Sequence, residues 1–332
     1  MRAGSTLSNV NGNAVDVVID RTDGEDSSKD IVIYNTKAEN LTFKSFKDTG
    51  AAYKTSLYIK ENAGLTVLED VDLYKDEGDS YGSNLYVEED AELIIQGDLA
   101  VSNISERLGS ITVDNLLVNT SYVTENGSLT VNNWMTVTTN FTSNSAETFN
   151  VKNLRTDNSY SGTVYVPLYN GLYQFDNLIL GGGVDDSDKE GAYSGIQLFN
   201  SNLTVENVLV ESGTNGMIDF QENKNDGSAL TANINNLYVE DTGTLLLNAQ
   251  EVGQNNILTV DAATFGSNSV IKGQDGNYDI NLQINQLSAD SLTFEKLSEH
   301  SNVSLGRAAL SGANSFAQKI MGIKTVIVLI LY

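Results

Sequence analysis

The chain has 332 residues, of which 40% are hydrophobic, a proportion that supports a buried core and excludes a polytopic membrane protein. Its 44 acidic residues outnumber 19 basic ones, and the formal net charge of -25 repels nucleic-acid phosphates and anionic lipid headgroups. Cysteine is absent, which excludes a disulfide framework and thiolate chemistry.

The first twenty residues do not have the form of a secretory signal peptide. Polar residues between Ser5 and Asn13 interrupt any apolar run, and a basic leader is missing. We therefore expect either that export uses a segment outside this chain or that the chain is a fragment of a longer protein.

An eight-residue pattern of apolar, any, apolar, polar, Asn, apolar, any, apolar recurs along the chain. The clearest copies are Ile111–Val118 (ITVDNLLV) and Leu203–Val210 (LTVENVLV). Weaker or longer copies begin at Leu41, Leu65, Leu93, Leu129, Phe149, Tyr173, Ala232, Leu258, Leu282 and Leu292. The spacing indicates a unit of about twenty residues plus insertions, which is typical of solenoid proteins.

Each copy predicts a strand, a corner and a second strand. The opening alternation places two apolar side chains on one face of a strand, and the polar pair that follows breaks the alternation. Asparagine recurs at this break, where it can adopt left-handed backbone angles and can form a hydrogen-bonded ladder between stacked units. These corner asparagines are Asn115, Asn133, Asn153, Asn177, Asn207 and Asn236.

Units of this size cannot bury an apolar face alone, so they are expected to stack. The sequence therefore predicts an all-β fold, a right-handed parallel β-helix (β-solenoid) over residues 1–304, because parallel crossovers are almost always right-handed. The alternative is an antiparallel β-sandwich. Asn-Gly dipeptides that suit hairpins occur at Asn11, Asn126 and Asn170, outside the repeat.

Two segments are weak candidates for binding. The stretch from Tyr160 to Tyr169 carries Tyr165 and Tyr169, which could stack on glycans, although alternating tyrosines also pack along a strand face. The insertion from Gly181 to Gly191 carries Asp185, Asp186 and Asp188, a weak calcium candidate and the best carboxylate cluster for glycoside hydrolysis.

Evidence for catalysis or for a cofactor is otherwise lacking in the sequence. Asp23–Asp30 supplies further oxygen ligands without a regular calcium-loop spacing. His300 is the sole histidine and is interpreted as a solvated loop residue. No Gly-x-Ser-x-Gly elbow occurs. We therefore expect a protein that is not an enzyme and that uses no cofactor.

The period changes near the C-terminus. Arg307–Gly322 has small residues with Leu310, Ala313, Ala317 and Ile320 on one side, which predicts a short C-terminal helix over residues 305–322. Residues 323–332 form an apolar tail that is too short to span a bilayer as a helix and is interpreted as a truncation or frameshift end.

The acidic rungs, rich in Asn, Gly, Ser and Thr with Leu-Thr-Val openings, resemble the passenger regions of autotransporter (type V secreted) proteins and their pectate-lyase-like β-helices. The C-terminal segment is similar to the helix that threads the translocator pore in this family. Lys319–Gly322 stands where a run similar to Arg-Met-Gly-Glu-Leu-Arg is common, without the acidic and second basic positions. The resemblance implies a C-terminal outer-membrane β-barrel that this chain lacks.

What the resemblance implies is a secreted protein at the bacterial cell surface that mediates adhesion or aggregation. Its expected partners are host-cell or matrix glycans or proteins, or copies on neighbouring cells, and no nucleic acid. Two alternatives remain open: a polysaccharide-binding or polysaccharide-degrading β-helix protein, and a structural surface-layer or matrix protein.

Overall fold

The computed structural model is all-β over the part of the chain that it describes. The described residues are 15–19, 29–33, 41–48, 55–73, 84–107, 109–125, 127–138, 141–144, 148–159, 162–182, 192–222, 229–249, 256–273, 280–295, 297, 301–310, 316–317 and 325–328. Every strand pairing with a defined register is parallel, which confirms the predicted parallel solenoid rather than an antiparallel sandwich. Within these ranges there is no helix with the length and apolar character needed to cross a membrane.

The chain divides into two compact units, described separately here. Unit 1 comprises residues 1–136 and 140–151, and unit 2 comprises residues 137–139 and 152–332. The strands of unit 1 are β1 (Val15–Ile19), β2 (Lys29–Ile33), β3 (Leu41–Asp48), β4 (Thr55–Ile59), β5 (Gly64–Val67), β6 (Val71–Asp72), β7 (Asn84–Val87), β8 (Glu92–Arg107), β9 (Ser110–Glu125), β10 (Ser128–Val137) and β11 (Thr142–Asn144).

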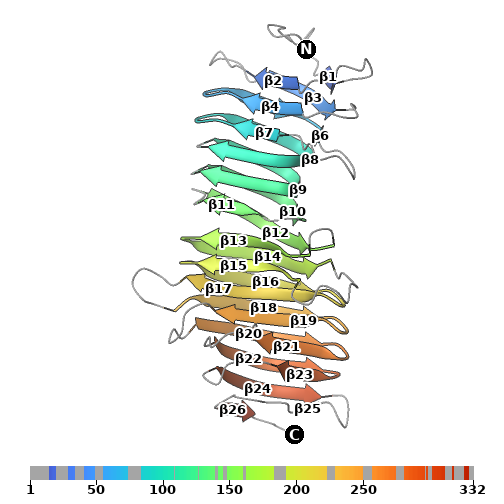
Figure 1. Ribbon diagram of the computed structural model, residues 1–332, viewed down its shortest axis with the longest axis vertical. Helices are drawn as coiled ribbons and strands as arrows, with labels where there is room; N and C mark the ends of the chain where they lie inside the picture. The colour runs from blue at the N-terminus through green and yellow to red at the C-terminus, as the bar shows by residue number, and fades with distance from the viewer. Residues whose placement is uncertain are drawn as a thin grey trace. The chain divides into compact units, whose positions relative to one another are not determined.

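Unit 2 has two parallel sheets (Figure 1). In unit 2, sheet A contains β12 (Thr148–Asp157), β14 (Leu172–Gly181), β16 (Asn202–Val210), β18 (Thr231–Val239), β20 (Asn256–Phe265), β22 (Ile280–Ala289), β24 (Asn302–Leu310) and β26 (Thr325–Val328). Sheet B is made of β13 (Val164–Tyr169), β15 (Ser194–Phe199), β17 (Asn215–Glu222), β19 (Thr244–Ala249), β21 (Ser269–Gly273), β23 (Leu292–Glu295) and β25 (Phe316–Ala317). The chain alternates between the two sheets, so that each coil adds one strand to each.

The core is built from apolar columns that run from coil to coil. In sheet A the predicted repeat openings fall opposite one another: Tyr173, Leu203, Ala232, Leu258 and Leu282 are consecutive register partners. In unit 1 the openings at Leu41, Leu65, Leu93 and Ile111 align in the same way. Alternation turns the apolar side chains inward, and stacking lets each coil cover the apolar edge of its neighbour. The buried members of these columns are Leu65, Leu93, Ile111, Leu203, Ala232, Leu258 and Leu282.

The corner asparagines mark a bend within a continuous strand. In β16 the inward alternation stops at Glu206 and Asn207, which are both exposed, and it resumes at Val208. Asn207 has no left-handed backbone, and the same holds for the other corner asparagines, so that expectation was wrong. Left-handed non-glycine residues lie at other turns instead, at Asn62, Asp90, Asn170, Asn200, Thr242 and Asn268.

A hydrogen-bonded asparagine ladder is present in sheet A of unit 2. The Nδ2 of Asn177 donates to Oδ1 of Asn153 at 2.6 Å. Asn207 donates to Asn177 and Asn236 donates to Asn207, each at 3.1 Å. In unit 1, Asn115 instead donates to Oδ1 of Asp98 at 2.7 Å, and its own oxygen accepts the N–H of Trp134; Asn133 is exposed.

Replacing Asn207 with leucine interrupts the ladder at its middle. We expect the free energy of unfolding to fall by about 1 kcal/mol, since the exposed Asn207 loses its two ladder hydrogen bonds and its hydrogen bond to the backbone oxygen of Asp176. Urea denaturation monitored by circular dichroism measures this. Thr204→Leu, an exposed position on the same strand outside the ladder, is the control, and an equal loss in both variants would contradict the ladder's role.

One expectation is corrected, that of a short C-terminal helix. Residues 305–310 of the predicted C-terminal helix belong to strand β24 and residues 316–317 to β25, because Asn302–Leu310 continues the register of β22. The degenerate copy at Leu292 lies in sheet B as β23, which pairs with β21. Asn170–Gly171 joins β13 to β14, strands of different sheets, so it forms no hairpin. Within the apolar tail, residues 325–328 form β26, which pairs with β24.

Candidate functional site

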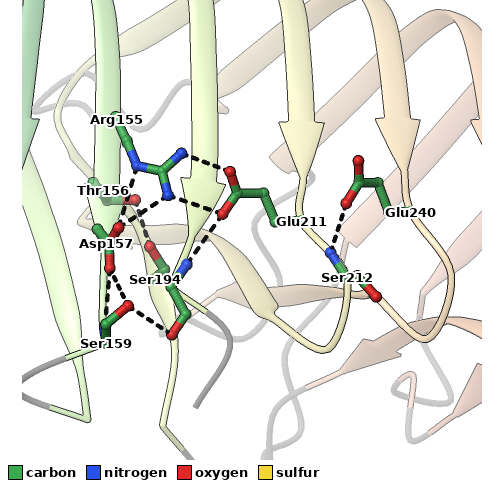
Figure 2. Close-up of polar contacts among 9 residues, drawn as sticks. Arg155, Thr156, Asp157, Ser159, Ser194, Glu211, Ser212 and Glu240 are labelled. Carbon is green, nitrogen blue, oxygen red and sulfur yellow. Dashed lines mark hydrogen bonds and ion pairs between the residues drawn. The ribbon is translucent and has the colours of Figure 1, made fainter. Parts of the chain in front are cut away.

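Acidic side chains at the turn after the sheet A strands hold the backbone of a neighbouring coil. Oε2 of Glu211 accepts the N–H of Gly182 at 3.3 Å, and Oε2 of Glu240 accepts the N–H of Ser212 at 2.9 Å (Figure 2). Oδ1 of Asp241 accepts the N–H of Ser267 at 2.7 Å. These carboxylates satisfy amide groups that the strands leave unpaired where they end, so part of the acidic composition is structural.

Arg155, near the end of β12, is the centre of a cluster of ion pairs (Figure 2). Its Nη1 and Nη2 donate to the two carboxylate oxygens of Glu211 at 2.6 and 2.9 Å. Its Nε and Nη2 donate to Oδ2 of Asp157 at 3.2 and 2.9 Å. The bidentate contact joins β12 to the turn that follows β16, and thus passes over the intervening strand β14.

Two glycines make room for this contact. A Cβ on Gly181 would lie 2.2 Å from Oε2 of Glu211 and 2.9 Å from Nη2 of Arg155. A Cβ on Gly182 would lie 2.4 Å from Oδ1 of Asp157, and its φ of +99 already favours glycine. The two glycines at the end of β14 therefore leave the space through which the guanidinium reaches Glu211.

The charges of the cluster favour a structural role. We call Arg155, Asp157 and Glu211 the clamp, because the guanidinium joins the two carboxylates. The side-chain bond to Glu211 raises the pKa of Arg155 above its ordinary value, against the opposing effect of burial. The pKa of Asp157 is lowered overall: burial acts to raise it, but hydrogen bonds from the side chain and backbone of Ser159 and from Arg155 outweigh that effect. Asp157 stays ionised with its oxygens occupied by donors, so it is poorly suited to act as a proton donor.

A second cluster lies on the outward face of sheet B, where the sequence had pointed to Tyr165 and Tyr169. Both tyrosines alternate along β13 with the buried Val164, Val166 and Leu168, so they face away from the core. Tyr169 stacks on Phe199 of β15 with ring centroids 4.6 Å apart. The structure thus places the two residues on one face, where Tyr169 packs along the sheet as the alternative interpretation expected.

Asp219 of β17 lies on this same outward face and is only 1% exposed. Three amides donate to it: Nε2 of Gln197 to Oδ2 at 3.0 Å, Nδ2 of Asn248 to Oδ1 at 2.9 Å, and Nε2 of Gln221 to Oδ2. Burial raises the pKa of Asp219, although these hydrogen bonds act to lower it. We call Tyr165, Tyr193, Gln197, Asp219, Gln221 and Asn248 the tyrosine–amide face.

Unit 1 carries an aromatic stack of its own. The rings of Tyr58 in β4 and Tyr86 in β7 stack 4.5 Å apart and are nearly parallel, at 6°. Lys60 lies 5.1 Å from the centroid of the Tyr58 ring and also forms an ion pair with Glu88. The stack follows from register, because Tyr58 and Tyr86 are direct partners.

The predicted calcium candidates are not tested by this geometry. Asp185, Asp186, Asp188 and His300 lie outside the described residues, as does most of Asp23–Asp30. Among the residues that the structure does describe, no group of three or more His, Asp or Glu side chains is arranged to hold a metal ion.

Sequence reasoning missed Arg155, Glu211, Asp219 and the pair Tyr58–Tyr86. A signal for the tyrosine pair exists: Leu57–Val67 (LYIKENAGLTV) and Leu85–Ile95 (LYVEEDAELII) repeat at a spacing that predicts stacking. Arg155 and Glu211 lie 56 positions apart, with coils of unequal length between them, and no local pattern connects them. Comparisons with protein-family models, with curated proteins and with solved structures find no match to the chain.

Proposed function

We propose that the chain is a secreted cell-surface β-solenoid of the autotransporter passenger type, which mediates adhesion or aggregation and performs no catalysis. The observation that carries this proposal is the regular repetition of outward positions. Because the coils stack with their strands in register, equivalent side chains of successive coils lie about 4.8 Å apart. They form rows of side chains that are suited to many weak contacts.

Those rows differ in chemistry, which supports a contact surface. Sheet A of unit 2 presents the amide ladder, sheet B presents the tyrosine–amide face, and unit 1 presents the Tyr58–Tyr86 stack. Tyrosine combines a rigid apolar ring with a polar hydroxyl, and it is effective at interfaces that stay partly wet. The net charge of -25 keeps copies apart unless specific contacts overcome the repulsion.

The adhesion proposal is tested with beads coated with the full chain. We expect coated beads to clump with one another or to attach saturably to cultured epithelial cells and to purified matrix, with attachment inhibited by soluble chain. Beads coated with heat-unfolded chain are the control. The absence of both clumping and attachment at full surface density would overturn the proposal.

A polysaccharide-cleaving function is the second candidate, because Arg155, Asp157 and Glu211 combine clustered acids with a basic partner. Glycoside hydrolysis needs one protonated acid and one free carboxylate, whereas here the pKa of Asp157 is lowered and both carboxylates accept the donors of Arg155. Release of reducing ends from neutral or anionic polysaccharides by the full chain, abolished in Glu211→Gln, would favour this candidate over adhesion alone.

A further inference from the structure

The buried carboxylate of Asp219 is the most unusual group on the outward face of sheet B. Outward side chains of a solenoid normally reach water, yet Asp219 is 1% exposed and the neighbouring outward side chain, Met217, is fully buried. The side chains around Asp219 are half-buried: Tyr165, Tyr193, Gln197 and Asn248 each keep part of their surface accessible. The tyrosine–amide face therefore has a buried centre, formed by Asp219 and Met217, and a partly exposed rim, formed by Tyr165, Tyr193, Gln197 and Asn248.

Asp219 fixes the orientation of the amides at this rim. Gln197, Asp219 and Asn248 are register partners on three adjacent strands. Each amide has two N–H donors and an acceptor oxygen, and the carboxylate accepts one N–H from each. An amide held in this way keeps its carbonyl oxygen and its other N–H at fixed positions, which is the kind of preorganised support that specific binding requires.

The aromatic part of the rim adjoins these amides. The backbone oxygen of Tyr193 accepts the N–H of Val164 at 2.8 Å, so Tyr193 lies beside the start of β13. Burial is the main cause that raises the pKa of Tyr193 to about 12, and interactions with Asp219 and Tyr165 add to it. Gly195, the register partner of Tyr165, places no side chain between Tyr165 and Met217. A Cβ at Gly195 would lie 2.5 Å from the backbone oxygen of Met217. The rim thus offers two tyrosines beside a row of oriented amides.

This combination has a definite ligand chemistry. Tyrosine rings pack against the apolar C–H faces of sugar rings, and oriented amides exchange hydrogen bonds with hydroxyl groups. The net charge of -25 disfavours anionic sugars. A cation gains little from Asp219, whose oxygens already accept three N–H groups in a buried setting.

We propose that the tyrosine–amide face binds a neutral polysaccharide, with Tyr165 and Tyr193 packing on sugar rings, Gln197 and Asn248 bonding to hydroxyls, and Asp219 acting as a positioning residue. The inference rests on the proposed function, to which it adds a ligand class. Successive strands repeat at about 4.8 Å, close to the length of one sugar residue, so a polymer that crosses the strands can contact several of them at once.

The binding experiment uses the full chain and four probes: a neutral glucan, a neutral galactomannan, anionic polygalacturonate and cationic chitosan. Affinity electrophoresis and calorimetry are expected to detect binding to at least one neutral polymer and to neither charged one. Tyr165→Ala and Tyr193→Ala are each expected to weaken that binding about tenfold or more. Tyr238→Ala is the matched control, since Tyr238 is a 46% exposed tyrosine on sheet A of the same unit.

Asp219→Asn separates positioning from folding. Asparagine removes the penalty of a buried charge, which in the native protein is present once the pH exceeds the raised pKa of Asp219, so the Tm at pH 7 is not expected to fall. Affinity for the neutral polymer is expected to fall about tenfold, because the Nδ2 of asparagine is a donor and cannot accept the N–H of every amide that Asp219 now orients. A lower Tm with unchanged affinity would show a purely structural role and overturn the assignment of Asp219.

The two proposals fail separately. Beads that attach to cells while the chain binds no neutral polymer would overturn the polysaccharide inference and leave adhesion in place. Polymer binding that survives Tyr165→Ala and Tyr193→Ala together would also overturn it, by placing the site elsewhere. Polymer binding without bead attachment or clumping would overturn adhesion alone.

Discussion

Replacing Arg155 with methionine is expected to lower the free energy of unfolding of unit 2 by about 2 kcal/mol. Removal of one partner from a buried ion pair costs about 3–5 kcal/mol, and the value is reduced here because the Arg155 side chain is 26% exposed. The loss arises because Glu211 and Asp157 keep their negative charges close together without the guanidinium between them. Urea denaturation with amide hydrogen exchange of β12, β14 and β16 measures the change.

Lys152→Met is the matched control for charge, since Lys152 is an exposed base on the same strand. A second test uses Gly181→Ala, whose Cβ would collide with the carboxylate of Glu211. The collision matters because Arg155 holds that carboxylate in place. Gly181→Ala should therefore cost less in the Arg155→Met background than in the native protein, and additive losses would contradict the clamp.

The effect of Arg155→Met also has a defined pH dependence. The folded-state pKa of Asp157 is lowered, so its contribution to stability is fully present above its unfolded pKa of about 4 and is lost as the pH falls through the folded value. The stability difference between variant and native protein should be constant from about pH 7 to 5 and should shrink below about pH 4. A difference that grows on acidification would contradict this assignment.

Replacing Ile234 with aspartate is expected to have the largest effect of a single change, at least about 4 kcal/mol of unfolding free energy. Ile234 is 1% exposed and lies in an inward column between Val205 and Val260. A carboxylate there has no described hydrogen-bond donor among these apolar neighbours. Loss of the β-sheet signal in circular dichroism, or a much lower urea midpoint, is the expected measurement.

The adjacent position provides the control for this prediction. Asn233 precedes Ile234 on β18 but is exposed, since alternation turns it outward. Asn233→Asp is therefore expected to change stability by less than about 0.5 kcal/mol. Similar losses at positions 233 and 234 would contradict the assignment of inward and outward faces.

The sequence was most informative where the repeat has a fixed phase. Leu203, Ala232 and Leu258 were predicted to be equivalent positions and are direct register partners, because one period-2 pattern can bury only one face. The corner asparagines were likewise expected to stack, and Asn153, Asn177, Asn207 and Asn236 form the ladder. The position of a residue within the repeat therefore predicted which residue it contacts on the neighbouring coil.

The strands of sheet B could not be predicted from the repeat. Apart from Leu292–Glu295, its strands, such as Val164–Tyr169 and Ser194–Phe199, do not carry the repeat, and they follow turns of variable length. The predicted C-terminal helix failed for a different reason. Arg307–Leu310 has small residues compatible with a helix, but pairing with Gln286–Ala289 of the preceding coil holds it in a strand. A formed edge strand overrides weak local propensity.

The most direct test of the fold uses cysteine pairs, because the native chain contains no cysteine. Thr204 and Asn233 are exposed register partners, whereas Thr204 and Gln283 are separated by three strand spacings, about 14 Å. Dibromobimane becomes fluorescent when it bridges two neighbouring thiols. A parallel in-register solenoid predicts rapid bridging in the Thr204→Cys/Asn233→Cys variant and none in Thr204→Cys/Gln283→Cys. Bridging in the second variant but not in the first would contradict the register of sheet A and with it the parallel solenoid.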